Sequence, residues 1–400
     1  MINPSANGWI EKFFHEQNEF NTLSSNSLEL YKNIRKTGLI YGYSVGVNSS
    51  SFIEIDKLKV DEIFKLSLLS TLYNVYCFST NTTESDVFIK KLISFYHLIS
   101  PKGFSLLNKI SPPTPNDELE TLLNSRIQTN KDSISKSFSH IVTNALLFLD
   151  VLAFKKYLIE DDISLNYLKK TEEIVISLAL LSLKIKSNKT HHDDLLIKLF
   201  EASVKYSKFA ELVQNENKIN LESLPLSKFN DDFEKFYLID ITAMTLWSDG
   251  KIENEELYFL EKVTEILEVE ATFCKESSLE IDNFIKKYKK EIPYLNYSNP
   301  VKHFYDKTTE NVTTLLSRNK LRLAKELKES KELVALLHQS TKRDLSKVEK
   351  KKVKKQLLDI FKTIPSFAIF MLPGGSLLLP ICIRFIPQLL PSAFNENFDD

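Results

Sequence analysis

Ser44 is the residue whose local sequence most resembles a catalytic motif. It stands in GYSVG, residues 42–46, which matches the G-x-S-x-G pattern of an acyl-transfer nucleophile. That pattern needs a strand before the serine, a helix after it and an α/β sheet to carry the histidine and the acid. VNSSSFIEI shows no helical period, and the rest of the chain offers few strands. We therefore expect a glycine-rich loop that wraps onto helices, and no hydrolase.

Two polar clusters contain residue types that bind metal ions. The run His191-His192-Asp193-Asp194 places four such side chains in sequence, but neighbouring residues on a helix point about 100° apart and cannot converge on one ion. Asp249, Glu253 and Glu256 could offer carboxylate oxygens to a divalent cation. Acidic residues are also typical of a helix N-terminus. We expect a polar helix start in both places, with no metal site and no cofactor.

The overall composition excludes several classes of protein. Fifty-two basic and fifty-three acidic residues give a formal net charge of −1, so no global field attracts DNA. Eight glycines in 400 residues form no phosphate-binding loop. The three cysteines are far apart and form no metal-ligand spacing, which indicates reduced thiols. The N-terminus does not resemble a secretory signal. We expect no enzyme activity and no small-molecule substrate.

Most of residues 52–290 has the apolar spacing of amphipathic helices, for example 86–100, 141–158 and 172–186. The predicted fold class is all-α, with multi-helix bundle domains and a proline-rich apolar segment near the C-terminus. We place soft boundaries near residues 225 and 295. The predicted domains are a helical domain at 1–225 with an irregular first 50 residues, a helical module at 226–295, and a C-terminal region at 296–400.

The middle region reads as a helical hairpin. FEKFYLIDITAMTLWSDGKIENEELYFLEKVTEIL predicts a helix that ends near Trp247, a tight turn at Gly250, and a second helix that begins at the acidic residues 253–256. The WSDGKIENEE turn resembles that of the TerB-like module. This all-helical bacterial domain is associated with tellurite resistance and membrane-linked stress systems.

The C-terminal region begins as a charged helix that we expect to be continuous from Asn319 to Ser340. Ser346 and Glu349 form an S-x-x-E capping box, which predicts a new helix start. Its apolar face is predicted to consist of Val353, Leu357, Ile360, Phe361 and Ile364. Nine basic residues against three acidic lie between Lys342 and Lys362. The lysines expected to face anionic lipid headgroups, or else ribosomal RNA, are Lys350, Lys351, Lys352, Lys354 and Lys355.

An uncharged run of membrane length follows directly, which favours lipid over RNA. It extends from Ile364 to Ile383 and is closed by Arg384. Twenty residues at a helical rise span about 30 Å, the thickness of a hydrocarbon core. The run and its flank carry helix-breaking residues, Pro365, Pro373, Gly374, Gly375, Pro380 and Pro387. It could therefore span the membrane, re-enter as a hairpin turned at 373–375, or lie buried under the helices of a soluble protein.

The residues from Arg343 to Phe394 resemble the membrane core of the LETM family, the leucine-zipper and EF-hand transmembrane proteins of the mitochondrial inner membrane. Both have a basic amphipathic stretch, a proline-rich apolar segment and a closing Leu-Pro-Ser-x-Phe signature. The signature residues here are Leu390, Pro391, Ser392 and Phe394. With the NPSANGWIEKFF start and the TerB-like middle, the chain resembles bacterial LETM-related biofilm-associated proteins.

The resemblance implies cation/proton exchange or potassium and calcium homeostasis, and ribosome binding by a helical domain. The sequence ends six residues after Phe394, so we expect the domain that follows in mitochondrial members, the zipper and the EF-hand to be absent. Ion pathways through membranes use ionisable residues, and the apolar run has no acidic residue or histidine to relay an ion.

The sequence as a whole predicts a non-enzymatic, LETM-like, membrane-associated protein. We expect a role in cation homeostasis or in envelope- or biofilm-linked scaffolding, with membrane lipids and a ribosome or other protein as partners. The expected location is the bacterial inner membrane, with attachment through residues 364–390 and the bulk of the chain in the cytoplasm. The alternative is a soluble, all-helical interaction module with a buried C-terminal hairpin.

Overall fold

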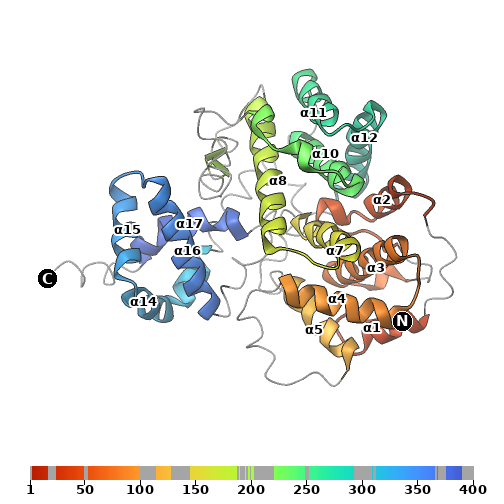
Figure 1. Cartoon of the computed structure of the whole chain (residues 1–400), viewed down its shortest axis with the longest axis horizontal. Helices are drawn as coiled ribbons and strands as arrows, with labels where there is room; N and C mark the ends of the chain where they lie inside the picture. Colours follow the sequence, from red (N-terminus) through yellow and green to blue (C-terminus); the bar gives the residue numbers. More distant parts are fainter. Residues whose placement is uncertain are drawn as a thin grey trace.

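The structure is a computed structural model that describes residues 2–16, 24–48, 53–99, 114–127, 145–186, 189, 194, 197–198, 200–201, 220–247, 252–291, 309, 312–364, 367 and 375–389. Every regular element in these ranges is an α-helix or a short 3-10 helix, and they contain no strand (Figure 1). The predicted all-α fold is confirmed.

The N-terminal part of the chain is a bundle of helices around an apolar core. Its elements are α1 (Trp9–Glu16), α2 (Ser27–Lys36), η1 (Leu39–Tyr41), η2 (Ile55–Lys57), α3 (Val60–Thr80), α4 (Ser85–Ile99), α5 (Pro115–Ile127), α7 (Phe148–Glu160) and α8 (Leu165–Ile185). α4 and α8 confirm two of the helices expected from periodicity, and α7 confirms the third where it is described. Helix α3 lies against α7, and Phe88 of α4 makes edge contacts with Tyr73 and Phe154.

Helices α1 and α2 lie in the first fifty residues, which we expected to be irregular. Trp9, Ile10 and Phe13 share one face of α1 and are buried. Glu120 of α5 anchors the start of that helix, because its carboxylate accepts hydrogen bonds from the backbone N–H groups of Gly8 (3.2 Å) and Ile10 (3.0 Å). The helix N-terminus is thus held by a residue more than a hundred positions away, which a local pattern does not reveal.

The glycine-rich stretch after α2 forms the expected loop on the helices. Gly38 has φ +80°, and a Cβ there would lie 2.2 Å from the Tyr43 carbonyl oxygen and 2.7 Å from the Phe284 ring. Ser44 is buried, follows the 3-10 turn η1, and precedes residues without regular structure. The strand–serine–helix arrangement of a nucleophile elbow does not occur at this serine.

The middle of the chain forms the two helices of the predicted hairpin, and the turn expected at Gly250 lies outside the described residues. The helices of this middle part are α10 (Asp232–Leu246), α11 (Asn254–Ile266) and α12 (Ala271–Tyr288), preceded by the 3-10 turns η6 (Leu221–Ser223) and η7 (Leu226–Lys228). α10 is capped at its C-terminus by Trp247, as expected, and packs against α8, α2 and α12. The predicted boundary near residue 225 therefore falls within one continuous core, and its role as a domain boundary stays a prediction.

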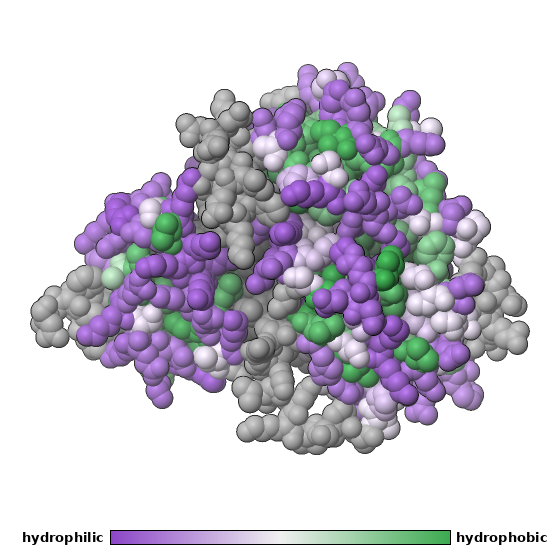
Figure 2. Space-filling view, viewed as in Figure 1, coloured by the Kyte–Doolittle hydropathy of each residue, from purple (hydrophilic) through white to green (hydrophobic). Residues whose placement is uncertain are grey.

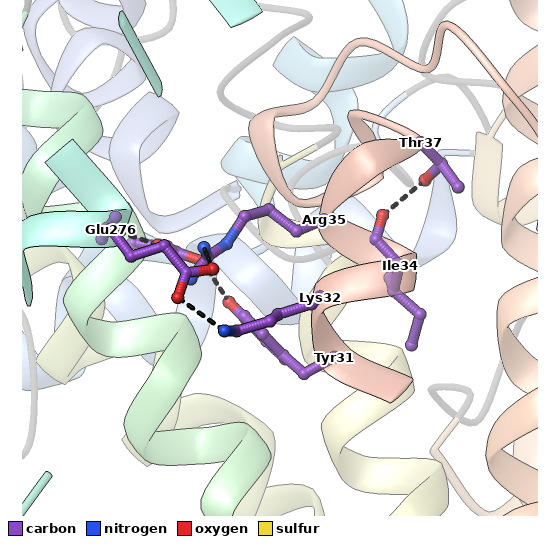
Figure 3. Close-up of polar contacts among 8 residues, drawn as sticks. Tyr31, Lys32, Ile34, Arg35, Thr37 and Glu276 are labelled. Carbon is purple, nitrogen blue, oxygen red and sulfur yellow. Dashed lines mark hydrogen bonds and ion pairs between the residues drawn. The ribbon is translucent and has the colours of Figure 1, made fainter. Parts of the chain in front are cut away.

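A buried polar cluster joins α2 to this hairpin (Figure 3). Arg35 and Asp240 are 2% and 1% exposed, and the Arg35 Nε lies 2.9 Å from Asp240 Oδ2. Tyr31 and Ser277 also donate their hydroxyls to Asp240, and half-buried Glu276 accepts from Arg35 (3.3 Å). Burial has the largest single effect and lowers the pKa of Arg35, but the Asp240 carboxylate together with Tyr31 and Tyr41 outweighs it, so the pKa is raised and the guanidinium stays charged.

Four further helices gather at one end of the molecule (Figure 1). They are α14 (Lys320–Lys328), α15 (Lys331–Lys342), α16 (Lys347–Thr363) and α17 (Gly375–Leu389), and we call them the C-terminal bundle. The prediction of one continuous charged helix from Asn319 to Ser340 is wrong, because the helix is interrupted at Glu329 and Ser330. The break lets two apolar faces, Leu323 and Leu327 on α14 and Leu333 and Leu337 on α15, reach the same core.

Candidate functional site: the basic face of the C-terminal bundle

Helix α16 begins where the sequence predicts. Ser346 accepts a hydrogen bond from the Glu349 backbone N–H, and Glu349 accepts one from the Ser346 backbone N–H (2.7 Å), which confirms the capping box. Arg343 adds two hydrogen bonds to the same carboxylate. These bonds, that from Arg343 first, lower the pKa of Glu349 to about 2, so the start of the helix carries a fixed negative charge.

The two faces of α16 differ in solvent exposure. Its predicted apolar face is fully buried, and none of its members is more than 8% exposed: Val353, Leu357, Ile360, Phe361 and the C-cap Ile364. The opposite face points to solvent and carries Lys347, Lys351 and Lys355. The side of the bundle visible in the space-filling view is mostly hydrophilic (Figure 2). Burial of one face by the protein therefore fixes the orientation of the other.

The lysines expected to form the binding face do not all play the same part. Lys352 lies 2.7 Å from Glu332 of α15, and Gln356 donates to the other oxygen of that carboxylate (2.8 Å). This flank of α16 is thus turned toward α15. Lys351 and Lys355 are exposed on the open side, and Lys350 and Lys354 are partly exposed. The open side, together with Lys347, is what a partner would meet.

The buried apolar face changes how this helix could meet a lipid surface. An interfacial amphipathic helix inserts its apolar side below the headgroups. In α16 that side packs on α14 and α15 instead. Only the lysine face is available for outside contact, so insertion of α16 into a bilayer would require the bundle to open. Headgroup contact by the lysines alone stays a prediction.

The apolar run after α16 is not one helix. α16 ends at Thr363, and Ile364 is extended (φ −112°, ψ 107°) and buried. A new helix, α17, begins at Gly375, the last residue of the predicted Pro373-Gly374-Gly375 turn. Pro365, Pro373 and Gly374 lie outside the described part. Among the described residues, no helix combines the length and apolar character needed to cross a bilayer.

Helix α17 packs within the C-terminal bundle. It contacts α15, and its buried side chains are Leu378, Leu379, Ile381, Cys382, Ile383 and Ile386. Pro380 and Pro387 lie inside it, and Arg384 is exposed, with its guanidinium carbon 5.5 Å from the Phe385 ring centroid. This packing is what the buried-hairpin alternative predicts for the second arm, whereas residues 365–366 and 368–374 of the first arm and the turn lie outside the described part. The signature residues Leu390, Pro391, Ser392 and Phe394 lie outside the described residues.

Two of the three acidic residues weighed as metal ligands cap a helix. Glu253 and Glu256 form a capping box at the start of α11, where Glu256 accepts from the Glu253 backbone N–H (2.8 Å). No group of three His, Cys, Asp or Glu suited to a metal occurs in the described ranges. Asp249 and His191-His192-Asp193 fall outside those ranges, and Asp194 is helical.

One family model matches the chain. Residues 345–400 match the model described as LETM1-like, RBD, where RBD denotes the ribosome-binding domain. No curated protein and no solved structure matches the chain. The matched residues include α16 and α17, whereas α14 and α15 precede them. By its sequence this stretch resembles the membrane core of the LETM family, whereas the matching model is named for a ribosome-binding domain. The match therefore supports the family resemblance and names a different domain. The C-terminal end of this chain is therefore similar to a LETM1-like ribosome-binding domain.

Proposed function

We propose that the chain is a LETM-like, non-enzymatic ribosome-binding protein, and that the open lysine face of α16 contacts ribosomal RNA. The observation that carries the proposal is the division of α16 into a fully buried apolar face and an exposed lysine face. The family match covers this helix and is named for ribosome binding. Phosphate groups of RNA are recognised mainly by lysine and arginine.

The charge distribution along the chain supports the same partner. Residues 312–364 contain fifteen Lys and Arg against six Asp and Glu, a formal charge of +9. The remaining residues contain thirty-seven against forty-seven, a charge of −10. A polyanion would attract the C-terminal bundle and repel the rest of the chain. This separation of charge would orient the protein on an RNA surface. It is not apparent from the overall charge of −1.

Attachment to the bacterial inner membrane is the second proposal. It is favoured by the uncharged run of residues 364–383, of which 365–366 and 368–374 are outside the described part. In this proposal the bulk of the chain is cytoplasmic, and the family's cation homeostasis or a scaffolding role takes place at the membrane. Both proposals use the same end of the chain, so an experiment must offer both partners.

We expect the full chain to co-sediment with purified ribosomes at 50 mM salt and to dissociate as salt is raised. Log affinity falls with log salt concentration, and each phosphate contact adds about 0.7 to 0.9 to the steepness of that fall. A flotation assay with vesicles of neutral and anionic phospholipid provides the second arm. Absence from the ribosome pellet at low salt, or association that salt does not weaken, would contradict ribosome binding. Flotation without co-sedimentation would favour the membrane.

A further inference from the structure

Helix α14 lies beside α16 but outside the residues that the family model matches. The Arg322 guanidinium donates a hydrogen bond to the Thr363 carbonyl oxygen at the end of α16 (2.7 Å). Leu323 and Leu327 are buried, which fixes α14 on the bundle core. The two helices are therefore held next to each other by a polar contact and by shared apolar packing.

The outer face of α14 is also basic. Between Arg318 and Lys328 there are five basic residues and one acidic. Lys320, Lys325 and Lys328 are exposed. Leu321 between them is 88% exposed, the highest value among the exposed large apolar residues of the described chain, and Val348 on α16 is 67% exposed. Exposed apolar residues set among lysines on two neighbouring helices are suited to a contact surface.

We propose that α14 and α16 together form one RNA-binding surface, so that the binding unit starts about 25 residues before the segment that the family model matches. The inference rests on the proposed ribosome binding and names a further part of that site. Its ligand is the phosphate backbone of ribosomal RNA, because the surface offers exposed positive charge from two neighbouring helices.

Two helices give more than additional charge. Lysines three or four positions apart on one helix lie along a single line. A second basic helix at its side widens that line into a surface, which can contact phosphates from two strands or from two turns of a folded RNA. A single helix from residue 345 onward would keep only one of these rows.

The test compares charge reversals on two helices of the C-terminal bundle in the full chain. The α14 variant is Lys325→Glu with Lys328→Glu, and the matched control on α15 is Lys331→Glu with Lys342→Glu. All four lysines are exposed, and both variants change the net charge equally. Affinity for purified ribosomes is measured between 50 and 300 mM salt, with circular dichroism and the thermal midpoint checked for each variant.

We expect the α14 variant to bind about 10- to 50-fold more weakly at 0.1 M salt, with a salt slope smaller by about 1.5, and the α15 control to stay within about threefold. Equal losses in both variants would show a general effect of charge and overturn the inference. Normal binding of the α14 variant, together with loss in α16 variants, would overturn the inference and leave ribosome binding in place. If no lysine variant changes binding, the proposed function fails as well. If the α14 reversal disturbs the fold, Lys325→Gln with Lys328→Gln is tested in its place. We then expect a smaller loss of ribosome affinity, again with a shallower salt dependence than that of the unchanged chain.

Discussion

Replacing Asp240 by alanine should lower the free energy of unfolding by about 3–5 kcal/mol, because the buried Arg35 guanidinium then keeps only the partly exposed Glu276 as a carboxylate partner. Tyr31 and Ser277 would also lose their acceptor. Each unsatisfied buried hydroxyl costs about 1–3 kcal/mol, although the three losses overlap. Urea denaturation followed by circular dichroism at several wavelengths measures the change.

The matched control removes both charges. Arg35→Met with Asp240→Leu replaces the ion pair with apolar side chains of similar size, which is often neutral or stabilising for a buried pair. We expect this double variant to regain the part of the lost stability that comes from the uncompensated Arg35 charge, whereas the Tyr31 and Ser277 hydroxyls remain without their acceptor. A loss of less than about 1 kcal/mol in Asp240→Ala would show that water reaches the pair and that the cluster does not tie α2 to α10.

Reversing four lysines of α16 should reduce affinity for ribosomes by at least about 10³-fold at 0.1 M salt. The substitutions are Lys347→Glu, Lys351→Glu, Lys354→Glu and Lys355→Glu. Each phosphate contact contributes about 0.7 to 0.9 to the steepness of the salt dependence. The loss of four contacts should therefore make the dependence of log affinity on log salt shallower by about 3. None of these side chains belongs to the buried face of α16, so the helix content and thermal midpoint should change little.

The control for this prediction reverses four exposed lysines of the N-terminal and middle helices, Lys36, Lys90, Lys170 and Lys275. They come from α2, α4, α8 and α12, and the change in net charge is the same. Ribosome affinity should then fall by no more than a few fold, through long-range repulsion. If this control and the α16 variant lose affinity equally, binding depends on total charge and not on the lysine face.

Local patterns of the sequence predicted the parts of the fold that local physics decides. The spacing of Val353, Leu357 and Phe361 predicted the buried face of α16, and the S-x-x-E box predicted its first turn. The acidic start of α11 was predicted as a cap for the same reason. In each case the interacting residues lie within a few helical turns of one another, so their chemistry is visible in a short window.

Contacts between distant residues decided what the sequence did not reveal. The partner of Arg35 lies two hundred positions away in α10, and Glu120 anchors α1 from α5. The break at Ser330 follows from packing, since the local sequence there has good helix formers and no glycine or proline. The basic face of α14 could have been found from the excess of lysine and arginine between residues 318 and 328, but its position beside α16 needed the structure.

The most direct test of the central claim is lysine footprinting of the unmodified full chain with and without purified ribosomes. Lysine amines are acylated briefly with a water-soluble reagent, and the modified sites are read by mass spectrometry. We expect ribosomes to protect Lys325, Lys351 and Lys355, while Lys90 and Lys275 react as they do in the free chain. Protection of the N-terminal and middle lysines, with those of α14 and α16 unchanged, would contradict it.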